Sequence, residues 1–255
     1  MDKLVFTALN TLSAQRFERQ SITNELANLS TVGFKKSYET ALETLKVSGG
    51  GFDSRFLTRI VEVDIINMKP GTPMATGRAL DVMMNDTTVL GVQAEDGSLA
   101  FTRRGDLRIN DAGLVETGAG DLVLEAGGGP LSVPPGSTVS FGPDGAVYAT
   151  DPLAPQVAPV QVGQLYLRDS SEARLVRRSD GLFAPFAEDS VGNGDIPLGD
   201  GMLSLTSGAL EGSNASAMDA MVRMIDLSRS FETNVRIMRE TRDLDQQGAS
   251  MMRLA

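Results

Sequence analysis

The stretch SAMDAMVRMIDLSRSFETNVRIMRE, residues 216–240, decides the fold of this chain. Its apolar side chains recur at gaps of three and four, close to a heptad spacing, which predicts an amphipathic helix with a narrow apolar stripe. We expect the helix to begin near Ser216, which precedes Asp219 in a capping pattern, although Ser213 or Asn214 could also cap it. The stripe contains Met218, Met221, Met224, Ile225, Ser228, Phe231, Val235 and Met238.

The same helical pattern continues to about residue 254 and has a counterpart at the other end of the chain. Some 40 helical residues would span about 60 Å, far more than the usual helix of about 11–12 residues. Residues 3–32 predict a shorter helix with Gly33 as its C-cap. Such helices need packing partners in water, either each other in a coiled coil or the helices of neighbouring copies. The N-terminal stripe contains Val5, Ala8, Leu9, Leu12, Ile22, Leu26 and Leu29.

The residues between the helices predict extended chain and β-structure. Residues 34–75 form a connector rich in glycine and proline, with one alternating run over Leu57–Ile65 that indicates a strand. Beyond it, short apolar runs alternate with Asp-Gly and Pro-Gly turn signals, which is typical of a mostly antiparallel sheet. The predicted strands are Ala79–Met83, Val89–Ala94, Leu99–Thr102, Leu107–Ile109, Leu122–Glu125, Thr138–Phe141, Ala146–Ala149 and Val160–Leu167.

The predicted fold class is therefore α+β, with four segments. They are an N-terminal helix at 1–33, an extended connector at 34–75, a central β-domain at 76–206 and a C-terminal helix at 207–255.

Composition argues against several function classes. The net charge of −10 is unsuited to nucleic acid, and we expect the pairs Lys35-Lys36, Arg103-Arg104 and Arg177-Arg178 to be solvated. Without Cys or His, thiolate chemistry, Cys/His metal sites and imidazole catalysis are excluded. Turn formation explains Asp96, Asp111, Asp144 and Asp180 without catalysis. We predict no catalytic, cofactor or metal site, and we find neither a signal peptide nor a membrane span of about 20 apolar residues.

Motifs at both ends carry a resemblance to a known family. The segment NELANLSTVGFKK at 24–36 resembles the N-terminal signature of bacterial flagellar rod and hook proteins, and GALEGSN at 208–214 with RSFETN at 229–234 resembles their C-terminal signature. The order of the central motifs also agrees, so the resemblance covers nearly the whole chain. The matching residues are Asn24, Leu26, Ala27, Asn28, Thr31, Gly33, Phe34, Lys35, Leu210, Glu211, Ser213, Asn214, Arg229, Phe231 and Glu232.

The resemblance implies a structural subunit of the flagellar basal-body rod and not an enzyme. Such a subunit leaves the cytoplasm unfolded through the flagellar type III export apparatus, without a cleaved signal peptide, and assembles in the periplasm. Its terminal helices, from many copies, form a coiled-coil-like tube that transmits torque and encloses the axial export channel. The expected partners are other copies, the short proximal rod subunits and the distal rod, with no nucleic acid and no direct membrane insertion.

The predicted subunit interface combines both helical stripes. It comprises Val5, Leu9, Leu12, Ile22, Leu26, Leu29, Met218, Met221, Met224, Ile225, Phe231, Val235 and Met238.

Two alternatives stay open. The opening MDKLVFTA and the stretch Asn85–Gly91, which lacks the Gly-x-Gly-Phe-Phe pattern of the distal rod type, favour the proximal rod type. A distal rod protein is the first alternative, and a soluble β-rich binding module with helical extensions is the second.

Overall fold

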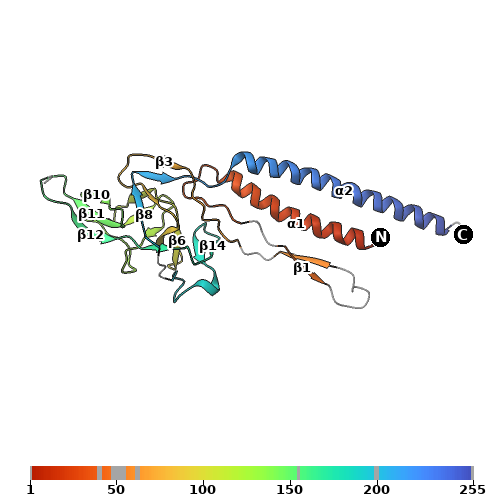
Figure 1. Cartoon of the computed structure of the whole chain (residues 1–255), viewed down its shortest axis with the longest axis horizontal. Helices are drawn as coiled ribbons and strands as arrows, with labels where there is room; N and C mark the ends of the chain where they lie inside the picture. Colours follow the sequence, from red (N-terminus) through yellow and green to blue (C-terminus); the bar gives the residue numbers. More distant parts are fainter. Residues whose placement is uncertain are drawn as a thin grey trace. The chain divides into compact units, whose positions relative to one another are not determined.

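A computed structural model of the chain describes residues 2–38, 42–46, 56–60, 64–153, 156–197 and 201–253. The chain divides into two compact units (Figure 1). The helical unit comprises residues 1–27, 39–63 and 216–255, and the β-unit comprises residues 28–38 and 64–215. Segments from both ends of the chain therefore contribute to each unit.

The helical unit contains two long helices and a two-stranded hairpin. The helices α1 (Asp2–Ala27) and α2 (Ala217–Arg253) lie side by side and run in opposite directions (Figure 1). The strands β1 (Leu42–Lys46) and β2 (Phe56–Ile60) pair antiparallel, and β2 contacts α1. The predicted strand over 57–65 thus begins as expected, but residues 61–63 lie outside the described residues.

The capping prediction for the C-terminal helix is confirmed at Ser216. The Asp219 N–H donates to Ser216 Oγ at 3.4 Å, and the Ala220 N–H donates to the Ser216 carbonyl at 3.0 Å. The hydroxyl oxygen satisfies one of the backbone donors that every helix start leaves unpaired. Ser216, and not Ser213 or Asn214, is therefore the N-cap.

The predicted end of the N-terminal helix is wrong. The helix α1 ends at Ala27 and a turn follows, so Gly33 is not its C-cap. Gly33 has a φ of 70°, and a Cβ there would lie 2.4 Å from the carbonyl carbon of Arg103. Glycine permits both this left-handed backbone and this close approach of two backbones.

The β-unit is built from short strands, all of whose described pairings are antiparallel, as the turn spacing predicts. The largest sheet has the order β14-β15-β6-β5-β9-β8-β7, with β13 also paired to β5, and smaller sheets are β10-β11-β12, β16-β4 and β17-β3. The strands are β3 (Pro73–Ala75), β4 (Val82–Met84), β5 (Thr88–Gln93), β6 (Leu99–Thr102), β7 (Leu107–Ile109), β8 (Val115–Thr117), β9 (Leu122–Val123), β10 (Thr138–Phe141), β11 (Ala146–Thr150), β12 (Val160–Gln164), β13 (Leu167–Asp169), β14 (Leu175–Arg177), β15 (Phe183–Pro185), β16 (Leu205–Ser207) and β17 (Ala209–Glu211), with a 3-10 turn at Ala187–Asp189.

Side chains from these strands pack together into one large apolar core. Val82, Leu90, Leu107 and Val147 are fully buried within it, and a second cluster gathers around Phe101. The predicted run over 160–167 is interrupted, because it forms two strands, β12 and β13.

The turn aspartates behave as the sequence predicts. A side-chain oxygen accepts the backbone N–H two residues further on at Asp96, Asp144 and Asp180, and this local bond stabilises the turn. The fourth turn aspartate, Asp111, is exposed.

Candidate functional site

The family-motif residues that follow α1 and those that precede α2 meet inside the β-unit. The Gly33 N–H donates to the Glu211 carbonyl at 2.7 Å, and the Asn214 N–H donates to the Phe34 carbonyl at 3.2 Å. The Lys36 N–H donates to Asn214 Oδ1 at 2.6 Å. Two motifs at opposite ends of the sequence therefore form one site.

At the centre of this site is a buried group of charges, which we name the charge cluster: Lys35, Arg103 and Glu211. Lys35 Nζ lies 2.6 Å from Glu211 Oε1, and Arg103 Nε lies 2.6 Å from Glu211 Oε2. Their side chains are only 0, 1 and 2 % exposed, respectively. The prediction that these two basic pairs are solvated is thus wrong for Lys35 and Arg103, because the fold buries both against one carboxylate.

The cluster holds two cations and one carboxylate, and backbone carbonyls accept further hydrogen bonds from both cations. Lys35 Nζ donates to the Lys69 carbonyl at 2.8 Å. Arg103 Nη1 donates to the carbonyls of Asp86 at 2.8 Å and Thr88 at 2.6 Å. The Gly71 N–H completes the shell of Glu211 by donating to Oε1 at 2.8 Å. Such hydrogen bonds are what make a buried ion group tolerable.

The electrostatic setting shifts the pKa of both Lys35 and Glu211. Burial, together with the nearby charge of Arg103, lowers the pKa of Lys35 to about 8, although Glu211 opposes this shift. Burial alone would raise the pKa of the Glu211 carboxyl, but hydrogen bonds and charges from Arg103 and Lys35 outweigh it, so this pKa is lowered. Glu211 therefore stays ionised at neutral pH, while Lys35 is the member of the cluster whose charge is least stabilised.

Asn214 and Phe34 extend the site around the cluster. Asn214 Nδ2 donates to the carbonyls of Asn67 at 2.8 Å and Lys69 at 3.0 Å. The Phe34 ring is buried, and the Arg177 guanidinium lies over it at 4.6 Å from the centroid. Arg177 also donates to the Lys35 carbonyl, and burial lowers its pKa, opposed by Asp64. One member of the third basic pair, Arg177, therefore also belongs to this site.

The remaining motif residues occupy simpler positions. In the β-unit, Thr31 Oγ1 donates to Asn28 Oδ1 at 3.1 Å, the Ala215 N–H donates to Ser213 Oγ at 3.1 Å, and Leu210 is buried. In the helical unit, Leu26 is half-buried. The other motif side chains there are exposed on the helices: Asn24, Ala27, Arg229, Phe231 and Glu232.

The predicted interface residues fall into several groups. Ile22 is fully buried where α1 meets Ala220 and Leu227 of α2, and Leu26 and Met224 pack against this contact. The exposed members are Met218, Met221, Ile225 and Phe231, the half-buried members are Leu12, Leu29, Val235 and Met238, and the side chains of Val5 and Leu9 lie outside the described part of the chain.

Three of the exposed members, together with Val222, define an outer face of α2, made of Met218, Met221, Val222 and Ile225. Their side chains are 78, 55, 52 and 51 % exposed, respectively. Because successive helix residues are rotated by about 100°, all four lie on the side of α2 away from Ala220, which packs near α1. Sequence reasoning missed Val222, although its position between Met221 and Ile225 on the same helix was a usable signal.

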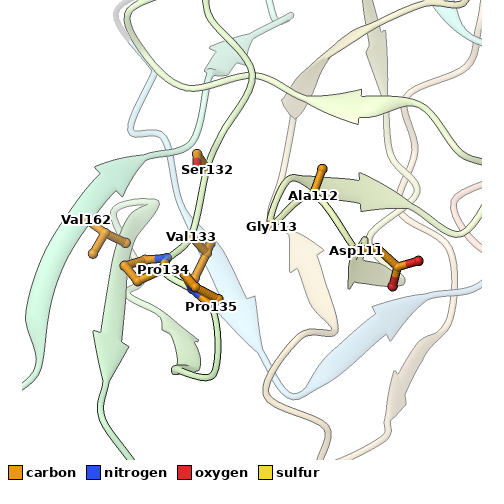
Figure 2. Close-up of a pocket in the computed structure, with 8 residues that line it drawn as sticks. All are labelled: Asp111, Ala112, Gly113, Ser132, Val133, Pro134, Pro135 and Val162. Carbon is orange, nitrogen blue, oxygen red and sulfur yellow. The ribbon is translucent and has the colours of Figure 1, made fainter.

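On the part of the chain that the structure describes, the other surfaces show no arrangement typical of catalysis. A groove of about 520 Å³ in the β-unit is lined by Val133, Pro134, Pro135, Val162, Asp111, Ala112, Gly113 and Ser132 (Figure 2). Its one carboxylate, Asp111, points away from Ser132, which carries the one hydroxyl group of this lining (Figure 2). Among the described residues, no three acidic side chains are placed to hold a metal ion. Within the same residues, no helix is both long and apolar enough to cross a membrane.

Comparison with known proteins agrees with the terminal motifs. A family model described as flagellar basal body rod FlgEFG protein C-terminal matches residues 206–251. The flagellar basal-body rod protein FlgF of Escherichia coli (strain K12) is 33% identical over 244 residues, with 95% of each chain covered. FlgF of Salmonella typhimurium (strain LT2) is 33% identical over 238 residues, with 93% of each covered. FlgG of Bacillus subtilis (strain 168) is 28% identical over 251 residues, with 91% of this chain and 92% of the relative covered. This chain therefore belongs to the family of flagellar basal-body rod proteins.

Proposed function

We propose that this rod protein is a subunit of the proximal rod, where it transmits torque and forms part of the wall of the axial export channel. The observation that carries the proposal is the outer face of α2. One side of this helix packs on α1 through Ala220 and Leu227, while Met218, Met221, Val222 and Ile225 stay exposed on the other. A helix with apolar side chains on two sides needs a second partner.

Neighbouring copies would supply that partner. Removing apolar surface from water stabilises a contact by roughly 25 cal/mol per Å², and a polymer repeats each contact at every subunit. The four side chains would be buried by helices of adjacent subunits, which together form a coiled-coil-like tube. Ile22, Leu26 and Met224 would hold the helix pair of each subunit together. The proposed contacts with neighbours also include Val5, Leu9, Leu12, Leu29, Phe231, Val235 and Met238.

The proposed route to the rod follows from the resemblance of both terminal motifs. The chain would leave the cytoplasm unfolded through the flagellar type III export apparatus, without a cleaved signal peptide. It would then assemble in the periplasm with copies of itself, the short proximal rod subunits and the distal rod. The net charge of −10 agrees with partners other than nucleic acid.

The resemblance implies that FlgF is the proximal and FlgG the distal rod type. A distal rod position is the second candidate, because FlgG proteins also match most of the chain at 28% identity. The higher identity of 33% to two FlgF proteins favours the proximal position. Labelling this subunit in isolated basal bodies would separate the two positions. Label close to the membrane base supports the proximal rod, and label at the level of the outer rings supports the distal rod.

Ile225→Asp tests the assembly surface. We expect this variant to be exported but not incorporated into rods, so that cells lacking their own copy of the gene stay non-motile. Leu26→Asp and Phe231→Asp should also block incorporation, with Leu26→Asp acting partly by separating α1 from α2. Thr233→Asp is the matched control, since it places the same charge at an exposed polar position of α2.

The readouts are the amount of subunit in purified basal bodies and swimming in soft agar. Circular dichroism of each purified variant checks that the β-unit is still folded. Normal swimming of the Ile225→Asp variant would show that the outer face of α2 is not an assembly surface.

A further inference from the structure

The charge cluster joins segments that are far apart in the chain, and its one carboxylate belongs to the last of them. Glu211 is separated from Lys35 by 176 positions and from Arg103 by 108. The segment 28–38 follows α1 directly, and β17 with residues 212–215 leads into α2. The cluster therefore ties together the two segments of the β-unit that are continuous with the terminal helices.

We propose that Glu211 is a latch: residues 28–38 dock stably on the β-unit only after residues 205–214 have taken their place there. In consequence, the segment that follows α1 does not stay docked without the segment that leads into α2. The latch deepens the proposed function, and rests on it for its purpose. It would prevent residues 28–38 from docking on the β-unit in a chain that has not fully left the export channel.

The first step of the argument is the set of bonds that hold the N-terminal segment. Gly33, Phe34, Lys35 and Lys36 all bond to Glu211 or Asn214. Among its described bonds, this segment also makes backbone hydrogen bonds to residues 65–67, one bond from Lys35 to the Lys69 carbonyl and one from Arg177. The C-terminal segment thus supplies a partner to each residue from Gly33 to Lys36.

The second step is the balance of charge. With Glu211 absent, docking of the N-terminal segment would bury the Lys35 ammonium beside the Arg103 guanidinium without a counter-charge. Uncompensated buried charge is strongly destabilising, whereas a hydrogen-bonded buried group can be close to neutral. Docking of the N-terminal segment before Glu211 is in place is therefore electrostatically unfavourable. This state also lacks the hydrogen bonds to Glu211 and Asn214.

The third step is an asymmetry within the cluster. If Lys35 is removed, Arg103 and Glu211 remain as a balanced pair joined by the Nε–Oε2 contact of 2.6 Å. If Glu211 is removed, two like charges remain together. A cluster that served only as packing would show no such difference between isosteric replacements.

Hydrogen exchange of the full-length purified monomer, read by mass spectrometry, tests the latch. The variants are Glu211→Gln and Lys35→Met, each close in shape to the native side chain. Glu116→Gln is the control, because Glu116 pairs with the exposed Arg108 at 2.6 Å and its described side-chain bonds go to Arg108 and Asn110, outside the cluster. For Glu211→Gln we expect exchange about tenfold or more faster in peptides covering both 31–38 and 205–214, with β5 and β6 unchanged. Lys35→Met should have a smaller effect, and Glu116→Gln none.

Two results would overturn the proposal. One is faster exchange in Glu211→Gln confined to 205–214, since the N-terminal segment would then dock alone. The other is a Lys35→Met effect as large as that of Glu211→Gln. If Glu211→Gln unfolds the whole β-unit, Asn214→Ala replaces it, because it removes the bonds to Lys36, Asn67 and Lys69 without leaving a charge. Loss of protection in 205–214 alone would again contradict the latch. Exchange in the monomer does not depend on rod assembly, so failure of the latch and failure of the proposed function are distinguishable.

Discussion

The helical unit and the β-unit bury their apolar side chains to very different degrees. In the β-unit, alternating strand residues such as Leu90, Leu107 and Val147 are fully buried in one core. In the helical unit, the described buried apolar cluster consists of Ile22, Ala220 and Leu227, with Leu26 and Met224 beside it. Among the side chains that the structure describes, this small cluster is the buried apolar part of the contact between helices of 26 and 37 residues, although such helices depend on packing for their stability. The difference agrees with the proposal that neighbouring copies add packing partners to the helical unit.

Alanine substitutions on the two surfaces test this comparison most strongly. Leu90→Ala should lower the free energy of unfolding by about 2–5 kcal/mol, because it leaves a cavity in a closed core. Ile225→Ala should change it by no more than about 0.5 kcal/mol, because the side chain is already half exposed in the monomer. Urea unfolding of the purified monomers, followed by circular dichroism, measures both values. Similar losses for the two variants would mean that the outer face of α2 is buried within a single chain.

The charge cluster allows a second test, based on pH. The pKa of Lys35 is lowered to about 8 in the folded chain from an ordinary value of 10.5. Between these values the unfolded chain binds more protons than the folded one, so the contribution of Lys35 to stability increases as pH rises. The gain is limited to about 1.4 kcal/mol per pH unit, and we expect about 1–2 kcal/mol between pH 8 and 9.5.

Comparison with Lys35→Met isolates this contribution. The other titrating groups are shared by both proteins. As pH rises, the free energy of unfolding of the native protein should therefore increase relative to that of Lys35→Met. The measurement is urea unfolding of both proteins at pH 7.5, 8.5 and 9.5. A difference that stays constant over this range would show that Lys35 keeps its proton up to its ordinary pKa.

Periodicity and turn chemistry predicted much of the fold. Strands β6, β7 and β10 have the predicted limits because each is short and bounded by turn residues. The start of α2 was predictable because Ser216 and Asp219 form a local signal. These features depend on residues only a few positions apart, which a sequence displays directly.

The charge cluster could not be predicted in the same way. A Lys-Lys or Arg-Arg pair carries no local sign of burial, and the carboxylate that compensates Lys35 lies 176 positions away. The prediction of Gly33 as a C-cap failed for a similar reason, because the close approach of the Arg103 backbone, and not a helix end, requires glycine there. The family resemblance marked Gly33, Lys35 and Glu211 as a set, but it did not show that they touch. The predicted assembly residues stay a prediction, since they concern contacts between chains.

A small effect of opposite sign is expected at Gln15, where the contact between α1 and α2 is imperfect. Gln15 Nε2 donates to Ser230 Oγ at 2.7 Å, but the buried Gln15 Oε1 has no partner among the described residues. An unsatisfied buried acceptor is destabilising, so Gln15→Leu should stabilise the monomer, by no more than about 1 kcal/mol. Ser230 is exposed and can bond to water once Gln15 is replaced. Thermal unfolding of the two helices measures the change.

The sign of this small effect matters more than its size. If Gln15→Leu stabilises the helix pair, the native contact between α1 and α2 is less stable than the contact that these helices could make. A weak contact within one chain suits helices that must also bind neighbouring copies. Ile22→Ala is the matched comparison, since it removes a fully buried apolar side chain from the same contact and should destabilise the pair. A loss of stability in both variants would show that the polar contact with Ser230 stabilises the helix pair. The helices would then be packed within one chain as well as the core of the β-unit is.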